Sequence, residues 1–83
     1  MLFFGFVKRV RNTEYMKSFG NNLKRLRLLK KLSRETLAAY ADIETMQVYR
    51  IETGKINTTI STVLALAKGL EIPPRKLFDF NFE

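Results

Sequence analysis

Two short segments with apolar patterning, Arg34–Ala41 and Thr45–Thr53, are separated by only three residues, and this spacing constrains the fold more than any other feature. A turn of three or four residues between two helices typically holds them at about 90–120°. Ala38 and Ala41 leave room for a close approach of the two helices, and the apolar Ile43 in the turn can plug their junction. The pattern therefore favours a helix-turn-helix pair over an unrelated helical hairpin.

Helical patterning also flanks this pair on both sides. Ser18 and Ser33 are N-cap candidates for the first and second helices, and Gly54 is placed to end the third in the left-handed conformation. A fourth helix begins after Thr59, and Pro74 fits the first position of a fifth helical turn. The fourth helix presents one apolar face, made of Ile60, Val63, Leu64, Ala67 and Leu70. We therefore expect an all-α domain of five short helices.

The two ends of the chain lie outside this pattern. Residues 1–17 show no sustained period, so we expect an N-terminal extension there, a helical domain over residues 18–79 and a C-terminal tail over residues 80–83. Met16 directly precedes the well-patterned first helix and is a candidate for the biological start. The last residues alternate with period 2, which is typical of a strand with one aromatic face. We expect extended apolar segments at both termini: Leu2–Val7, and Phe78, Phe80 and Phe82.

The composition indicates a polyanionic partner and excludes several classes of site. Fifteen Lys and Arg residues oppose eight acids, which gives a formal net charge of +7. Nine of the basic residues lie between Lys8 and Lys31, where Glu14 is the only acid, so this run is either a solvated face or a surface for nucleic acid. The chain contains no Cys and no His, which removes thiol nucleophiles, zinc sites and imidazole bases. We therefore expect neither an enzyme nor a bound metal or cofactor.

Four segments, 33–43, 48–55, 59–70 and 73–78, follow one another in an order and spacing that resemble the lambda-repressor/Cro-like (XRE) helix-turn-helix family. The end of the third helix, Ile51-Glu52-x-Gly54-Lys55, is the most specific part of the resemblance. The resemblance implies a compact five-helix lambda-repressor-like domain that binds double-stranded DNA. It also implies a transcriptional regulator without a small-molecule ligand domain. The absence of cysteine, and so of disulfides, indicates a cytoplasmic protein.

The same resemblance implies a role for individual residues. Four of them fall at the positions of the recognition helix, residues 45–53, that face the bases: Thr45, Met46, Tyr49 and Arg50. Four others match positions that hold the phosphate backbone: Arg34, Gln47, Lys55 and Asn57. Arg27 and Glu52 match the internal ion pair of the family, so they belong to the scaffold.

The residue types fit these roles, and each also has a structural alternative. Arg50 can fork onto guanine O6 and N7, which is worth about 1–3 kcal/mol of discrimination, and Met46 offers a methyl group to thymine. The alternatives are that Arg50 is an exposed salt-bridge donor, Met46 a core residue, and Tyr49 an aromatic that packs between helices.

Two residues at the helix-turn-helix junction depart from the family pattern. Asp42 stands where the family most often has glycine, and aspartate adopts the left-handed conformation only at some cost. Glu44 replaces the usual Ser or Thr at the N-cap of the recognition helix. Glutamate suits the helix dipole but caps poorly, and it repels a phosphate placed there.

One recognition helix spans only part of a helical turn, so the leading hypothesis is a homodimer on an inverted repeat with half-sites about 34–36 Å apart. The candidate dimer contacts are the fifth helix, the aromatic tail and Leu2–Val7, and the alternative for the tail is packing on its own core. A second hypothesis is an antitoxin-type module that grips a partner protein, a toxin or another regulator, with its aromatic termini and binds DNA for autoregulation. A third is a basic membrane-surface peptide led by Leu2–Val7, but no stretch is long enough to span a bilayer.

Overall fold

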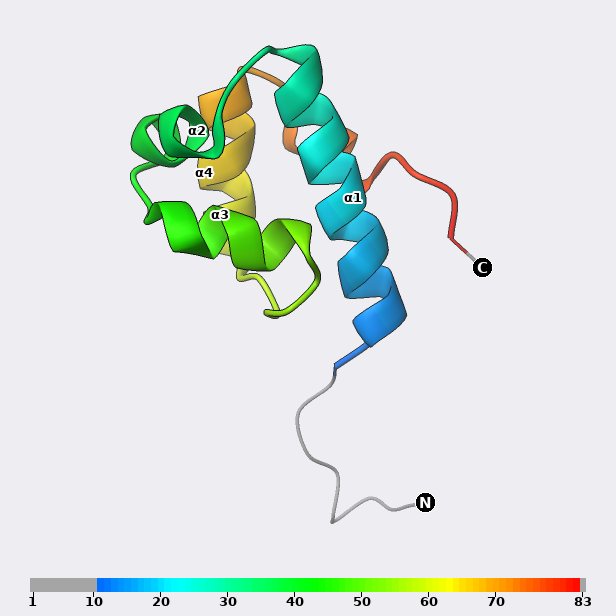
Figure 1. The fold of residues 1–83 in the computed structure, drawn as a ribbon. Coiled ribbons are helices and arrows are strands. Elements are labelled where there is room, and N and C mark those ends of the chain that lie inside the picture. The colour runs from blue at the N-terminus through cyan, green and yellow to red at the C-terminus, as the bar shows by residue number, and fades with distance from the viewer. Residues whose placement is uncertain (1–10, 83) are drawn as a thin grey trace, which may run out of the picture.

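The computed structural model describes residues 11–82, which form four α-helices and a 3-10 helix (Figure 1). Their bounds are α1 Thr13–Leu29, α2 Arg34–Ala41, α3 Thr45–Glu52, α4 Ile60–Leu70 and η1 Pro74–Phe78. Within these residues there is no strand, so the all-α class is confirmed, but the prediction of five α-helices is wrong in its last element. Pro74 stands at the first position of this segment, as expected, but the segment has only five residues, and helices this short are commonly of the 3-10 type.

The second helix and the turn that follows it are set by local capping signals. Ser33 Oγ accepts a hydrogen bond from the N–H of Thr36 at 3.0 Å, as its N-cap position predicts. Asp42 takes the left-handed conformation, with φ at 58°, and ends α2 where the family uses glycine. The N–H of Ile43 then bonds back to the carbonyl of Ala38 at 3.0 Å. This local bonding places α3 directly after a three-residue turn.

The first helix begins more than one turn earlier than expected. Its N-cap is Asn12, whose Oδ1 accepts the N–H of Tyr15 at 2.9 Å, and not Ser18. Met16 is buried in the core, so the segment before Ser18 continues the helix. The start of the chain at Met16 remains a prediction, and the apolar Leu2–Val7 patch lies outside the described residues.

The aromatic tail packs on α1 and does not form the strand-like extension expected from its period. The ring of Tyr15 lies 5.2 Å from that of Phe80 and 4.9 Å from that of Phe82, between centroids. Phe19 and Phe78 are 5.0 Å apart in the same way. Because aromatic rings on α1 are available as partners, the tail packs back on its own chain, which was one of the two alternatives.

The core lies between α1 with α3 on one side and α2 with α4 on the other, and Figure 1 shows α4 behind α2 and α3. Its fully buried side chains come from all five elements: Leu23, Leu37, Val48, Ile51, Leu66, Leu70 and Leu77. The apolar face expected for α4 is only partly buried, because Ile60 is 88% and Leu64 45% exposed. No helix in the described part of the chain has the length and apolar character needed to cross a bilayer.

Gly20 lies where α1 crosses the C-terminal end of α3. A Cβ at this position would overlap the carbonyl oxygen of Ile51 and lie 2.6 Å from that of Glu52. Both obstacles are backbone atoms, so a side chain cannot relieve the contact by rotating. The distance between α1 and the end of α3 therefore depends on the absence of a side chain here.

We expect Gly20→Ala to lower the free energy of unfolding by about 1–3 kcal/mol, as in other overpacked contacts. Urea denaturation monitored by circular dichroism measures the change. Asn21→Ala is the matched control, because Asn21 is exposed on the next position of α1, and a surface substitution is expected to change stability by less than about 0.5 kcal/mol. A Gly20→Ala protein as stable as the wild type would contradict the close contact.

Candidate nucleic-acid interface

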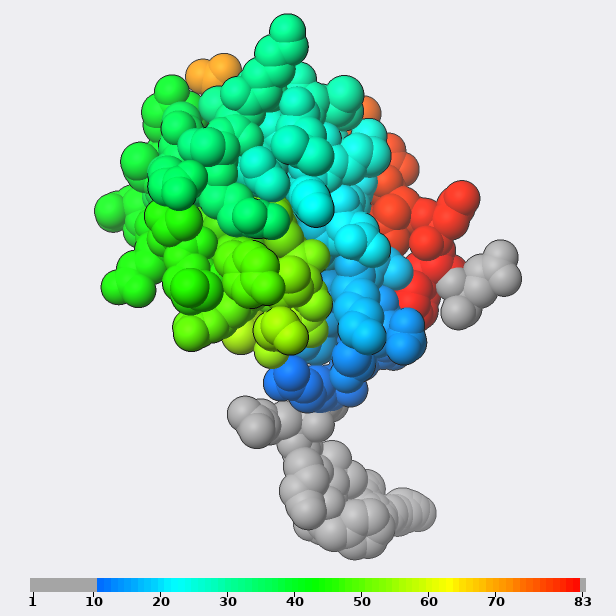
Figure 2. Space-filling view, viewed as in Figure 1, coloured from blue at the N-terminus to red at the C-terminus, as the bar shows by residue number. Residues whose placement is uncertain are grey.

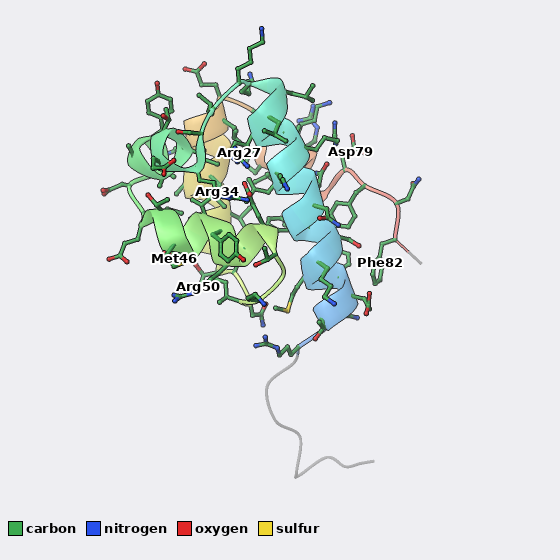
Figure 3. The ribbon with its side chains drawn as sticks, viewed as in Figure 1. Arg27, Arg34, Met46, Arg50, Asp79 and Phe82 are labelled. Atoms are coloured by element: carbon green, nitrogen blue, oxygen red, sulfur yellow. The ribbon has the colours of Figure 1, made fainter. Side chains whose placement is uncertain are left out.

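The outward face of α3 carries side chains that can reach a partner. Met46, Tyr49 and Arg50 are exposed and share one face of the helix, because they are spaced i, i+3, i+4. Val48 and Ile51 point the other way and are buried. In Figure 3, Met46 and Arg50 lie at the outer edge of α3, away from α1. The helix is therefore held by its inner face and free on its outer one.

The structure decides between several of the alternatives for these residues. Met46 is 52% exposed, so the core interpretation is wrong. Arg50 is exposed and forms no ion pair with any residue between 11 and 82. Thr45 and Gln47 are half-buried and lie on either side of the exposed face. The outward face therefore combines a thioether methyl group, a phenol and a guanidinium.

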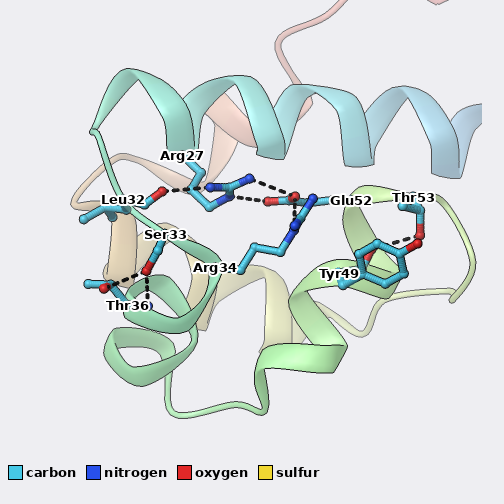
Figure 4. A network of polar contacts seen from close by, with 8 residues as sticks. All are labelled: Arg27, Leu32, Ser33, Arg34, Thr36, Tyr49, Glu52 and Thr53. Atoms are coloured by element: carbon cyan, nitrogen blue, oxygen red, sulfur yellow. Dashed lines mark hydrogen bonds and ion pairs between the residues drawn. The ribbon is translucent and has the colours of Figure 1, made fainter.

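A buried ion pair joins α1 to the end of α3 (Figure 4). Arg27 Nε donates to Glu52 Oε2 at 2.6 Å and Arg27 Nη2 to Glu52 Oε1 at 3.2 Å. A third donor, Arg27 Nη1, binds the carbonyl of Leu32 at 2.8 Å in the linker before α2. The side chains are only 7% and 1% exposed, so this pair is part of the scaffold and not of the contact surface.

Arg34, expected to contact phosphate, lies against this scaffold pair. Its Nε donates to Glu52 Oε1 at 2.9 Å, and its guanidinium carbon lies 5.3 Å from the ring centroid of Tyr49. The side chain is still 34% exposed. The structure therefore places Arg34 between the Glu52 carboxylate and a residue of the outward face of α3.

The loop after α3 carries the other expected backbone contacts, and α1 supports it. Lys55 and Asn57 are both exposed, and the carbonyl of Lys55 accepts a hydrogen bond from Arg11 Nη2 at 3.1 Å. Gly54 has a positive φ of 73°, and a Cβ there would lie 2.9 Å from Lys17 Cα. Figure 2 shows the loop pressed against the N-terminal half of α1. These contacts hold Lys55 beside α3.

The basic run from Lys8 to Lys31 includes Lys17 and Lys24, but the row that they form on α1 was not singled out from the sequence. Lys17, Asn21 and Lys24 are exposed, and they line a groove of about 290 Å³ together with Arg34, Glu52 and Thr53. Neither lysine is ion-paired with an acid of the described residues. Their i, i+4, i+7 spacing was visible in the sequence, but only the packing of α1 against α3 shows that this row borders α3.

The N-terminus of α3 is capped as poorly as its sequence predicts. Glu44 is the N-cap residue, and its side chain makes no capping hydrogen bond. The first turn of α3 contains no acidic residue. The backbone N–H groups of this turn are therefore not bound by the Glu44 carboxylate, which is exposed.

Comparisons with known proteins agree with this geometry. The family model for Helix-turn-helix (HTH_3) matches residues 23–77. The restriction-modification controller protein C.AhdI from Aeromonas hydrophila is 40% identical, with a TM-score of 0.75 over 76% of this chain and 96% of that one. Wild-type C.Esp1396I, another such controller protein, is 25% identical, with a TM-score of 0.75 over 82% and 90% of the two chains.

A longer regulator contains the same fold as one part of its chain. An HTH_3 family transcriptional regulator from Vibrio cholerae is 29% identical, with a TM-score of 0.76 over 80% of this chain but only 37% of that one. No curated protein matches the chain. The likeness therefore comes from solved structures and from the family model.

Glu52→Gln tests how far the scaffold depends on the buried carboxylate. We expect it to lower the free energy of unfolding by about 3–5 kcal/mol, because Arg27 would then be a buried charge without an anion. Urea denaturation measures the change. Replacing both partners, as Arg27→Met with Glu52→Met, should cost less than Glu52→Gln alone, since no buried charge is left unpaired and Arg34, whose side chain is 34% exposed, can be hydrated.

Glu35→Gln is the matched control, because Glu35 is an exposed acid on α2 that forms no ion pair among the described residues. We expect it to change the free energy of unfolding by less than about 0.5 kcal/mol. Equal effects of Glu35→Gln and Glu52→Gln would show that the Glu52 carboxylate is not a special support of the fold.

Proposed function

The chain belongs to the HTH_3 family of helix-turn-helix DNA-binding transcriptional regulators, and we propose that it is a cytoplasmic homodimer that binds an inverted repeat in double-stranded DNA. The observation that carries this proposal is the outward face of α3, where Met46, Tyr49 and Arg50 are exposed on a helix whose opposite face is buried. A helix of this kind fits the major groove, where each base pair presents a distinct pattern of donors, acceptors and methyl groups. In this proposal Arg50 binds guanine, and Met46 and Thr45 contact thymine methyl groups.

Backbone contacts supply most of the affinity, while α3 supplies the choice of sequence. Lys55 and Asn57 in the loop after α3, and Gln47 beside the outward face, are the phosphate contacts proposed from the sequence. The basic row of Lys17 and Lys24 extends this surface onto α1. Since these lysines have no described acid as partner, their charge is available to neutralise phosphates.

The proposed dimer contact is the uncovered apolar face of α4, formed by Ile60 and Leu64. These residues are four positions apart on one face and are 88% and 45% exposed. Ile60 is the first residue of α4 and directly follows the loop that carries Lys55. An isologous contact needs one self-complementary patch, and a pair of apolar side chains on a helix provides it.

The likeness to C.AhdI supports a more specific proposal, that the chain controls a restriction-modification system. The 40% identity extends over almost the whole length of that controller protein. For the antitoxin-type alternative, Phe80 and Phe82 contact Tyr15, while Phe78 and Phe82 remain 45% and 40% exposed.

Arg50→Ala and Lys55→Ala separate base recognition from backbone binding. We expect Arg50→Ala to weaken binding to the specific site by about 1–3 kcal/mol and to leave binding to random duplex almost unchanged. Lys55→Ala should weaken both to a similar degree and reduce the slope of log K against log salt by about one. Fluorescence anisotropy at several salt concentrations, with a site obtained by selection, measures both quantities. Equal loss on the two duplexes for Arg50→Ala would exclude its role in base recognition.

Ile60→Asp combined with Leu64→Asp tests the dimer surface. We expect the double variant to sediment as a monomer and to keep the helical circular dichroism of the wild type, because both side chains are exposed in the protomer. Leu28→Asp with Leu29→Asp is the control, since these residues are 54% and 67% exposed at the far end of α1. If the control, and not the α4 variant, gives a monomer, the proposed dimer surface is wrong.

A further inference from the structure

We propose that Arg34 is a positioning residue that orients Tyr49 on the recognition helix, and that it does not serve as a phosphate clamp. This inference rests on the proposed DNA-binding function and assigns a different task to a residue first expected to hold the DNA backbone. If it is correct, Arg34 contributes to the choice of sequence without contacting DNA.

The guanidinium of Arg34 is held from two sides. Its Nε donates to Glu52 Oε1 at 2.9 Å, and its carbon lies 5.3 Å from the centroid of the Tyr49 ring. This is within the range of a cation–π contact. Figure 4 shows Arg34 reaching from α2 toward Glu52 and Tyr49 on α3. To leave this position for another rotamer, the side chain would have to give up the bond to Glu52 and uncover the ring.

The anchor of this arrangement is rigid. The Glu52 side chain is 1% exposed, and Arg27, itself 7% exposed, binds both of its oxygens. Arg34 thus attaches to a carboxylate whose position α1 has already determined. One of the two arginine charges is neutralised by this carboxylate, so the group carries a net charge of +1 and not +2.

Tyr49 is the part of this arrangement that reaches the outward face of α3. Tyr49 is 39% exposed. Its backbone carbonyl accepts hydrogen bonds from the N–H of Thr53 at 3.0 Å and from Thr53 Oγ1 at 2.9 Å. Its backbone is therefore held at the end of α3, and the Arg34 contact limits where the ring can turn. The backbone hydrogen bonds and the Arg34 contact together restrict the orientation of the phenol in the unbound protein, which lowers the conformational entropy lost when DNA binds.

A groove of about 630 Å³ extends this effect to the neighbouring base-contacting positions. Arg34 and Tyr49 line it together with Thr45 and Met46. The orientation of the ring therefore sets one wall of the space beside Met46, whose side chain is proposed to contact bases. Loss of Arg34 would alter which base pairs fit this space, and it would leave the basic residues of the phosphate surface in place.

The test is a double-mutant cycle between Arg34→Gln and Tyr49→Leu, measured on the selected site and on random duplex over a range of salt concentrations. We expect Arg34→Gln to weaken the specific site about two- to fivefold and to leave random duplex and the salt slope unchanged. In the Tyr49→Leu background the same substitution should have no further effect on the specific site. Arg34→Lys, which keeps a cation over the ring, should restore part of the preference.

Lys24→Gln is the matched comparison, because Lys24 is a basic residue beside Arg34 in the α1 groove and is proposed to contact phosphate. We expect it to weaken both duplexes alike and to lower the salt slope. If Arg34→Gln behaves as Lys24→Gln does, or if its effect persists in the Tyr49→Leu background, the positioning role is overturned. A wild-type protein without preference for any sequence would instead contradict the proposed function itself, so the two failures are distinguishable.

Discussion

The buried carboxylate of Glu52 is the interaction on which the rest of the structure depends. Glu52 is the C-terminal residue of α3. Its carboxylate forms ion pairs with Arg27 of α1 and with Arg34 at the start of α2. Arg27 also binds the carbonyl of Leu32, so the linker between α1 and α2 belongs to the same network. A buried charge is costly unless its hydrogen bonds are satisfied, and here the cost is offset only in one relative placement of the three helices.

This placement explains how α3, the proposed recognition helix, is held in position although it is short. One face of α3 is fixed by Val48, Ile51 and Glu52, while Gly20 allows α1 to approach its end closely. An eight-residue helix has little stability of its own, so its geometry comes from these contacts. The side chains of the outward face, Met46, Tyr49 and Arg50, are therefore available for binding, because the buried face already holds the helix in place.

Local signals predicted much of the fold, whereas features that depend on distant contacts were missed. Ser33 and Asp42 cap α2 through their own neighbourhood and could be recognised from residue type alone. The early start of α1 is capped locally by Asn12, but Tyr15 in the added turn packs on the tail, and no local pattern predicts that contact. For the candidate site, the sequence could place Arg50 on the third helix, but only the structure shows that Arg34 is bound to Glu52.

Binding-site selection from a random duplex library, with the intact chain, tests the central claim most directly. The account predicts enrichment of an inverted repeat whose half-sites are centred one helical turn, about 10–10.5 base pairs, apart. It also predicts that the Arg50→Ala protein loses preference at one symmetric pair of positions and keeps the rest of the site. A pool that shows no enriched sequence after repeated selection, or identical pools for the two proteins, would contradict recognition of DNA through the outward face of α3.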